Sequence, residues 1–396
     1  MTDQESALLP GPVARPAHDS LRNRGVEFRN AFCNTPQCSP ARSSLLTGLA
    51  PHRSGVLTNV DGSSLGKPLR TNVTTLGNVF RDAGYGTAYF GKWHLGDEQT
   101  GPKSFGFADR QTGSDTVSAQ AAADWIQQQS GPWLAWVSIL NPHHIYEIVD
   151  KIRSVARRTD VRPPATTRTD LSTKPSAQSR YLREDQGRPT LKYTPEDWVR
   201  YRSFYCELVE KADRCFATTL AAIRDFSNTI VIYTSDHGDA LGEHGLPFKG
   251  PFLYDPLIRV PLVMAAPGFS KGSVRNDFVV SADLAPTLTS LAGLTWPSSV
   301  DGKDLSKGDS KRDAVFLEYY GKQHWVEPIR TIRTREWKLS RYSSGETELY
   351  DLKIDPTESK NLSMAPKMAG IKNNLDKRLS DWWTGMPRPT ESDRRR

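Results

Sequence analysis

A cysteine and an arginine four residues apart form the segment with the clearest chemical potential. Cys38 begins the run CSPARSSLLTG, Arg42 follows within it, and the run leads into residues that favour a helix. A guanidinium group and a helix N-terminus both lower the pKa of a nearby thiol, and the thiolate is the reactive form of cysteine. The run therefore predicts a reactive Cys38. A loop cysteine beside an arginine that only packs is the alternative that these residues alone leave open.

Acidic and histidine side chains gather in a second segment, SDHGDALGEHG, which begins at Ser235 directly after an apolar run. Asp236 and the adjacent His237 can point at one ion where the chain turns, and hard cations prefer oxygen ligands. The segment predicts a divalent cation site. The alternative is a capping aspartate and a surface histidine.

Two further groups of polar residues follow apolar runs that we expect to be strands. They are Lys92 and His94 in GKWHLG, and His143 and His144 in NPHH. On the residues alone, a turn around a packed tryptophan and hydrogen-bonded loop histidines explain them equally well.

The elements that must position these groups alternate between strand and helix. Apolar runs predict strands at 87–90, 133–140, 229–234 and 262–266, and periodic or capped stretches predict helices at 74–83, 198–223 and 283–292. This alternation predicts an α/β fold with a largely parallel sheet covered on both faces. The polar groups follow the carboxyl ends of strands, where open α/β sheets place their ligand sites.

The character of the chain changes in two places. Residues 151–193 are rich in Arg, Thr, Ser and Pro without a hydrophobic period, which predicts a surface excursion, either a substrate lid or a loop. A second strand-rich pattern at 329–342 precedes a hydrophilic C-terminal helix. We expect a catalytic domain of residues 1–310 and a smaller subdomain of residues 311–396.

The ordered set of motifs resembles that of the sulfatase family in the alkaline-phosphatase superfamily. The Cys38 run is similar to the signature C-x-P-[S/A]-R-x-x-x-L-T-G at every fixed position, and the Asp236 segment resembles SDHGD-x-LGEHG followed by a lysine, here Lys249. SADLAPTL at 281–288 and ELYDL at 348–352 continue the match. The resemblance implies an alkaline-phosphatase-like three-layer α/β/α sandwich with a large mixed, mostly parallel sheet. It also implies a C-terminal α+β subdomain with an antiparallel sheet.

The resemblance also implies the chemistry. A formylglycine-generating enzyme would oxidise Cys38 to formylglycine, and the hydrated aldehyde would attack the sulfur of a sulfate ester to form a covalent sulfo-enzyme. A divalent cation, Ca²⁺ with Mg²⁺ as the alternative, would assist as a Lewis acid. The implied metal ligands are Asp3, Gln4, Cys38, Asp236 and His237.

The remaining roles follow from the same resemblance. Arg42 and Lys92 hold residue 38 and the sulfate oxygens, and Lys249 contacts the sulfate. His94 is the implied general base for the diol hydroxyl, and His143 the acid toward the leaving alcohol or a sulfate ligand. The implied substrate is a small-molecule or saccharide sulfate ester.

The start of the chain departs from the family pattern. Family members open with a buried strand ending in Asp-Asp or Asp-Gln, whereas only Met1 and Thr2 precede Asp3 and Gln4 here. The N-terminal strand is therefore expected to be missing, through a misplaced start or a true truncation, at the cost of unpaired backbone groups in the core. This loss keeps an inactive, binding-only protein open. A phosphonate monoester or phosphodiester hydrolase is the other alternative.

Composition restricts partners and location. The net charge is +7, but the chain has no aromatic-basic RNA-binding signature and no zinc-finger spacing, so we expect no nucleic-acid partner. No apolar stretch approaches the roughly 20 residues of a transmembrane helix. The N-terminal residues have no apolar signal region, which predicts a cytoplasmic protein, with a periplasmic or secreted one left open by the doubt about the start.

Overall fold

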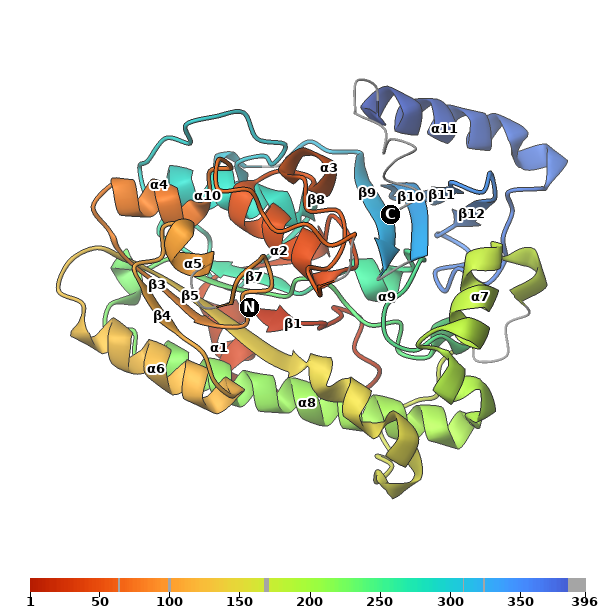
Figure 1. Cartoon of the computed structure of the whole chain (residues 1–396), viewed down its shortest axis with the longest axis horizontal. Helices are drawn as coiled ribbons and strands as arrows, with labels where there is room; N and C mark the ends of the chain where they lie inside the picture. Colours follow the sequence, from red (N-terminus) through yellow and green to blue (C-terminus); the bar gives the residue numbers. More distant parts are fainter. Residues whose placement is uncertain (63–64, 99–100, 167–170, 309, 323–324, 384–396) are drawn as a thin grey trace.

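The computed structural model describes residues 1–62, 65–98, 101–166, 171–308, 310–322 and 325–383. Two four-stranded sheets, of order β1-β5-β3-β4 and β6-β7-β2-β8, lie in the larger part of the molecule, and a third sheet lies at one end (Figure 1). The strands of the larger part are β1 (Thr2–Asp3), β2 (Val26–Phe32), β3 (Gly86–Gly91), β4 (Asp109–Gln111), β5 (Trp133–Pro142), β6 (Val231–Thr234), β7 (Leu262–Ala265) and β8 (Ser273–Val280).

Helices cover both faces of these sheets. In Figure 1, α6 and α8 run along one face, and α2, α4 and α10 lie on the other. The helices are α1 (Pro16–Arg24), α2 (Cys38–Thr47), α3 (Pro51–Ser54), α4 (Leu76–Asp82), α5 (Gly101–Ser104), α6 (Asp115–Gln128), α7 (Ser176–Glu184), α8 (Pro195–Ala221), α9 (Asp255–Ile258), α10 (Leu284–Leu291) and α11 (Ala369–Trp383).

Strand direction makes the sheet mixed. The pairs β1/β5, β3/β5, β3/β4 and β2/β8 are parallel, whereas β7 runs antiparallel to both β2 and β6. The layered α/β architecture with a mostly parallel sheet is confirmed. The predicted helix at 198–223 begins earlier, at Pro195, because the Thr194 side chain accepts from the Asp197 amide and completes a capping box.

The N-terminal strand was predicted to be missing, and this prediction is wrong in one respect. Strand β1 is present between β5 and β6: Thr2 pairs in parallel with Ile139 of β5 and bridges to Ser235 just after β6. It has only two residues. Met1 adds one more bond to the ladder, its amino group donating to the carbonyl of Val137 over 2.8 Å.

The sequence predicted a surface excursion at residues 151–193. The structure corrects this prediction, because part of the segment is a helix with a buried face. It contains helix α7, whose Ala177, Gln178 and Tyr181 are buried. The Gln178 amide donates to Glu348 Oε1 of the third sheet over 3.1 Å. The burial spacing is that of one helix face, and a buried glutamine among charged neighbours hides it from a hydrophobic pattern.

The third sheet is antiparallel, of order β12-β11-β10-β9, and α11 packs against β10 and β11. Its strands are β9 (Ala314–Lys322), β10 (Trp325–Thr334), β11 (Trp337–Tyr342) and β12 (Thr347–Asp351). The expected C-terminal antiparallel sheet is therefore confirmed. None of the described helices combines the length and apolar character of a membrane span.

Candidate active site

Cys38 is the first residue of α2, and its side chain is fully buried. Its sulfur lies 3.2 Å from Lys249 Nζ, 3.3 Å from His237 Nε2 and 3.6 Å from Lys92 Nζ. The sequence predicted a loop cysteine running into a helix, and the structure places it at the helix N-terminus, where the helix dipole favours negative charge.

The charges around Cys38 overcome its burial. Burial alone would raise the pKa of this thiol, but Lys249, Lys92 and His237 hold that pKa well below its ordinary value. Cys33, five residues earlier and equally buried, lacks such neighbours, and burial raises the pKa of its thiol. The four cysteines are free, and Cys38 is the one whose thiol pKa is lowered, while burial raises the pKa of the other three. This contrast supports the prediction of a reactive Cys38, which stays a prediction.

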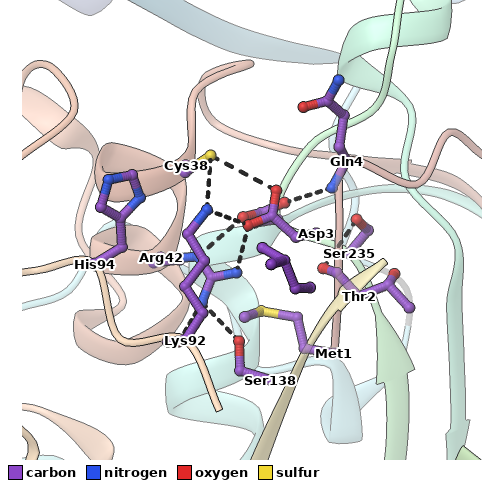
Figure 2. A network of polar contacts seen from close by, with 12 residues as sticks. Met1, Thr2, Asp3, Gln4, Cys38, Arg42, Lys92, His94, Ser138 and Ser235 are labelled. Carbon is purple, nitrogen blue, oxygen red and sulfur yellow. Dashed lines mark hydrogen bonds and ion pairs between the residues drawn. The ribbon is translucent and has the colours of Figure 1, made fainter. Parts of the chain in front are cut away.

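Arg42 lies one helical turn after Cys38, so both side chains leave α2 on the same face. Its guanidinium group donates to Asp236 Oδ2 over 3.0 Å and to Asp3 Oδ2 over 2.9 Å. It also donates to the Lys92 carbonyl and to Ser138 Oγ, each over 2.7 Å. Through these bonds, Arg42 links α2 to β1 and to the end of β6. Figure 2 shows its contacts with Asp3 and Ser138.

Asp3, Cys38, Asp236 and His237 form a group that can hold a metal ion: one ligand atom from each lies within 4.8 Å of the others. All four side chains are fully buried. His237 Nδ1 lies 2.8 Å from the Gly238 carbonyl and must donate there, so in the neutral form of the ring Nε2, on the side of Cys38, offers a lone pair to a metal ion. Carboxylate oxygens and an imidazole nitrogen suit a divalent cation, so the residues fit the ion that the sequence predicted.

The family resemblance implied that Gln4 is a further metal ligand. In the structure, its side chain is hydrogen-bonded to other groups of the site. Its amide oxygen accepts from Lys249 Nζ over 2.7 Å, and its amide nitrogen donates to Asp239 Oδ2 over 2.7 Å. Its backbone amide donates to Asp236 Oδ1 over 3.0 Å. Gln4 therefore holds both a metal-ligand candidate and the lysine beside Cys38.

The two lysines approach Cys38 from different elements. Lys92 follows β3, and its Nζ contacts Asp3 Oδ2 at 2.6 Å. Lys249 is buried, and Cys38 and Asp3 together raise its pKa against the opposing effect of burial. Positive charge is thus fixed on both sides of the sulfur, as the predicted anion-binding roles require.

The neighbouring histidines His143 and His144 lie in different environments. His143 is among the groups that lower the pKa of the Cys38 thiol, and its ring is tilted against that of Tyr146 with the two ring centroids 4.9 Å apart. Burial lowers the pKa of His143. His144 instead lies 2.9 Å from Asn141 Oδ1 and pairs with Glu147 at the surface. His143, and not His144, faces the site.

His94 lies at the edge of the network, and no dashed interaction in Figure 2 reaches its ring. Its backbone is left-handed, with φ 60°, and its amide donates to Glu98 Oε1 over 2.7 Å. Its Nδ1 is buried without a hydrogen-bond partner among the described residues. The site thus holds a histidine with an uncommitted nitrogen close to the lysine of the same loop.

Sequence reasoning assigned no role to two residues that hold the site together. Asp239 accepts from Gln4 and from Tyr201 OH, and burial raises its pKa to about 6. Ser138 in β5 accepts from Arg42. Asp239 could have been found, since it stands in the same segment as Asp236, but Ser138 is an ordinary strand residue without any local signal.

Known proteins resemble this chain over almost its whole length. The sequence model of the Sulfatase family matches residues 1–294, and the model described as N-sulphoglucosamine sulphohydrolase, C-terminal, matches residues 242–384. A Δ4,5-hexuronate-2-O-sulfatase of Bacteroides thetaiotaomicron is 28% identical over 400 residues, which cover 92% of this chain and 83% of the relative.

Solved structures also resemble this chain over almost its whole length. A 2-O GAG sulfatase aligns with a TM-score of 0.84 and 25% identity over 97% of this chain and 90% of its own. The phosphonate monoester hydrolase of Agrobacterium radiobacter aligns with a TM-score of 0.78 and 22% identity, covering 99% and 96% of the two chains, which is a likeness of fold alone. With a family match over residues 1–294 and a buried cysteine, cationic groups and ligand cluster in one place, the chain belongs to the sulfatase family of sulfuric ester hydrolases.

Proposed function

We propose that this protein hydrolyses the sulfate ester of a saccharide or small molecule, with formylglycine derived from Cys38 as its nucleophile and a divalent cation as its cofactor. One observation carries the proposal. Four ligand atoms, one of them the Cys38 sulfur, converge within 4.8 Å at a helix N-terminus flanked by two lysines. Such a site suits an anionic ester beside a cation.

The cation would be held by Asp3, Asp236, His237 and residue 38, with Ca²⁺ as the first expectation and Mg²⁺ as the alternative. When bound, it supplies Lewis-acid polarisation of the sulfate. Formylglycine supplies, as its hydrate, a hydroxyl nucleophile in place of the thiol. Arg42 keeps Asp3 and Asp236 in place through its two ion pairs.

The remaining residues bind the ester and move protons. Lys92 and Lys249, on either side of residue 38, bind the sulfate oxygens and stabilise the charge that develops there. His143, which contacts residue 38 from the end of β5, gives its proton to the leaving alcohol. His94, with its uncommitted Nδ1, takes the proton of the diol hydroxyl.

A saccharide is the preferred alcohol. The 28% identical relative is a hexuronate-2-O-sulfatase by name, and the 2-O GAG sulfatase has the same fold along almost the whole chain. The position of the sulfate on the sugar does not follow from these names.

The test begins with the modification. We expect co-expression with a formylglycine-generating enzyme to change the mass of the Cys38 peptide from that of cysteine to that of formylglycine. The converted protein should hydrolyse an aryl sulfate and, faster, a sulfated hexuronate. Full conversion without hydrolysis of any sulfate ester would overturn the proposal.

The phosphonate monoester hydrolase remains the second candidate, because one such enzyme shares the fold. Rates on a sulfate monoester and a phosphonate monoester, measured side by side on the converted protein, discriminate the two. We expect the sulfate to react faster. A binding-only protein is tested by calcium: a complete site should raise the melting temperature as the ion is added.

A further inference from the structure

The end of strand β9 brings the C-terminal sheet up to the active site. The side-chain amide of Gln37, one residue before Cys38, donates to the carbonyl of Gly321 in β9 over 3.0 Å. The next residue, Lys322, places its Nζ 3.5 Å from the carbonyl of Lys249. Lys249 thus directs its ammonium group to Cys38 and its carbonyl to Lys322. Lys322 is therefore a cation beside the site to which the proposed reaction gives no role.

The ammonium group of Lys322 is fixed but keeps a donor to spare. The Lys322 side chain is 10% exposed, and its Nζ lies 5.0 Å from the centre of the Tyr181 ring in α7. It donates to Gln186 Oε1 over 2.5 Å and, at the longer distance given above, to the Lys249 carbonyl. An ammonium group has three donors, so one remains for a further partner.

The charge of Lys322 is only partly neutralised. Asp185, at 3.7 Å, is the one carboxylate within ion-pair distance of Lys322 among the residues that the structure describes. Burial lowers the pKa of Lys322 to about 8, with Asp185 opposing and Lys249 adding to this effect. Lys338, a buried lysine of the same sheet, has two carboxylates within 2.7 Å instead. Poorly paired buried charge is costly, and such groups gather at functional sites.

The surface next to Lys322 is positively charged. Residues 151–193, which include both the amide and the carboxylate that contact Lys322, contain eleven Lys and Arg and four Asp and Glu, a net charge of +7. The whole chain has the same net charge of +7, so the rest of it is neutral. Arg183 and Arg188, which flank the two contacting residues, are exposed. Such a field attracts a ligand more strongly the more negative charge that ligand carries.

We propose that Lys322 is a specificity-determining residue, which binds a second anionic group, a carboxylate or a further sulfate, of the sulfated saccharide. This inference rests on the proposed function, in which Lys92 and Lys249 bind the sulfate that is cleaved. Lys322 then binds the other anion with its remaining donor. Only the length of the Lys249 side chain separates the two positions, which a saccharide can span. A substrate without a second anion would leave Lys322 with its long ion pair to Asp185 alone.

The test measures binding without turnover, in the Cys38→Ala variant, which lacks the proposed precursor of the nucleophile. Calorimetric titration gives Kd for a monosulfated hexuronate, a disulfated hexose and a monosulfated hexose that has no second charge. We expect at least one of the two dianionic sugars to bind about tenfold or more tightly than the monoanionic one. Adding Lys322→Met should reduce this preference by about 10- to 100-fold, and Lys322→Arg should restore most of it. The dianionic sugar with the larger loss identifies the anion that Lys322 binds.

Two further variants separate recognition from structure. Lys174→Met removes a lysine that is as buried as Lys322, and whose Nζ donates to Tyr350 OH over 2.7 Å and to the Glu358 carbonyl over 2.6 Å. The preference for dianionic sugars should stay within about twofold in this control. Gln186→Ala removes the hydrogen-bond partner of Lys322 but not its charge, so it should reduce the preference clearly less than Lys322→Met does.

Three results would refute the role of Lys322. They are no preference for a dianionic sugar in Cys38→Ala, an unchanged preference in Lys322→Met, and equal losses in Gln186→Ala and Lys322→Met. The last would mean that Lys322 only holds the loop beside it. Hydrolysis does not enter this measurement. A protein that binds with the expected preference but cleaves no sulfate ester contradicts the proposed function alone, whereas one that cleaves an aryl sulfate but shows no preference contradicts this inference alone.

Discussion

Two buried ion clusters in this protein have nearly the same composition and opposite designs. The first is the active-site cluster of Asp3, Asp236, Arg42, Lys92 and Lys249. The second, which we call the joint cluster, lies where the C-terminal sheet meets α9. Its members are Asp255, Arg259, Arg333, Lys338 and Glu358.

In the joint cluster, each charge meets an opposite one directly. Lys338 Nζ lies 2.7 Å from Asp255 Oδ1 and 2.6 Å from Glu358 Oε1, and Arg333 Nη2 lies 3.1 Å from Asp255 Oδ2. Arg259 Nη1 also lies 3.9 Å from Asp255 Oδ2, so two carboxylates face three cations. Both carboxylates are engaged by cations of the protein itself, so the role of this cluster is to hold the two parts of the molecule together.

In the active-site cluster, three cations face two carboxylates, and the Cys38 sulfur lies between the two lysines. Under the proposed function, conversion of Cys38 to formylglycine would put a neutral group in place of the thiol and leave this positive charge for an anionic substrate. At the same time, carboxylate oxygens and an imidazole nitrogen converge on one point. Convergent lone pairs and a thiol with a lowered pKa, rather than burial, ion pairing or the count of charges, therefore distinguish the active-site cluster from the joint cluster.

The first prediction breaks the active-site cluster at its centre. Cys38→Ala removes the proposed precursor of the nucleophile, so kcat for an aryl sulfate should fall about 10³-fold or more. The control is Cys33→Ala, an equally buried cysteine whose thiol only faces the Leu257 carbonyl at 3.7 Å. Comparable kcat losses in both variants would show that a buried thiol at this end of α2 matters for folding rather than for chemistry.

The second prediction breaks the joint cluster. Lys338→Met leaves Asp255 and Glu358 without their shared buried cation and should lower the free energy of unfolding by about 3–5 kcal/mol. The kcat of the folded protein should stay within about twofold. Chemical denaturation provides the measurement.

Lys377→Met is the matched control, because Lys377 pairs with Asp381 at 2.7 Å on the exposed face of α11. Removing an exposed partner should cost less than about 1 kcal/mol. A selective loss of kcat in Lys338→Met would contradict the separation of the two clusters.

The third prediction concerns the residue that positions Gln4. The Asp239 carboxylate accepts hydrogen bonds from Gln4, Tyr201 and the Leu241 amide, and Asp239→Asn replaces one of its two accepting oxygens by an amino group. Gln4, and Lys249 bonded to it, should therefore lose their fixed orientation. Loss of such outer partners typically costs 10–100-fold in activity or metal affinity. We expect kcat and calcium affinity to fall within that range while the melting temperature changes little. A pure rise in KM would instead place Asp239 in substrate binding.

The contrast between the clusters also shows which parts of the structure could be predicted from the sequence. The runs around Cys38, Lys92, His143 and Asp236 predicted the site because each follows a strand or opens a helix, and local sequence encodes those positions. The residues of the joint cluster show no such local signal in the sequence. Its members come from α9, two strands and a loop, and only the fold brings them together.

Two misjudged elements have the same cause. Strand β1 is too short for any periodicity, and its place between β5 and β6 depends on pairing with residues more than 130 positions away in the chain. Helix α7 buries Gln178, a polar residue whose partner Glu348 lies in the third sheet. Patterns of apolar residues report local burial well, but they cannot report burial that rests on distant polar partners.

The last prediction uses pH to sharpen the comparison. Burial raises the pKa of Glu358 from 4.5 to about 7 against the opposing pull of Lys338. Between these values the folded state holds a proton that the unfolded chain has released, so stability falls as pH rises. From pH 5 to pH 7 this loss amounts to roughly 2 kcal/mol. Glu358→Gln, which cannot titrate, should flatten the curve of unfolding free energy over that window. An unchanged slope would mean that the joint cluster keeps Glu358 ionised down to pH 5.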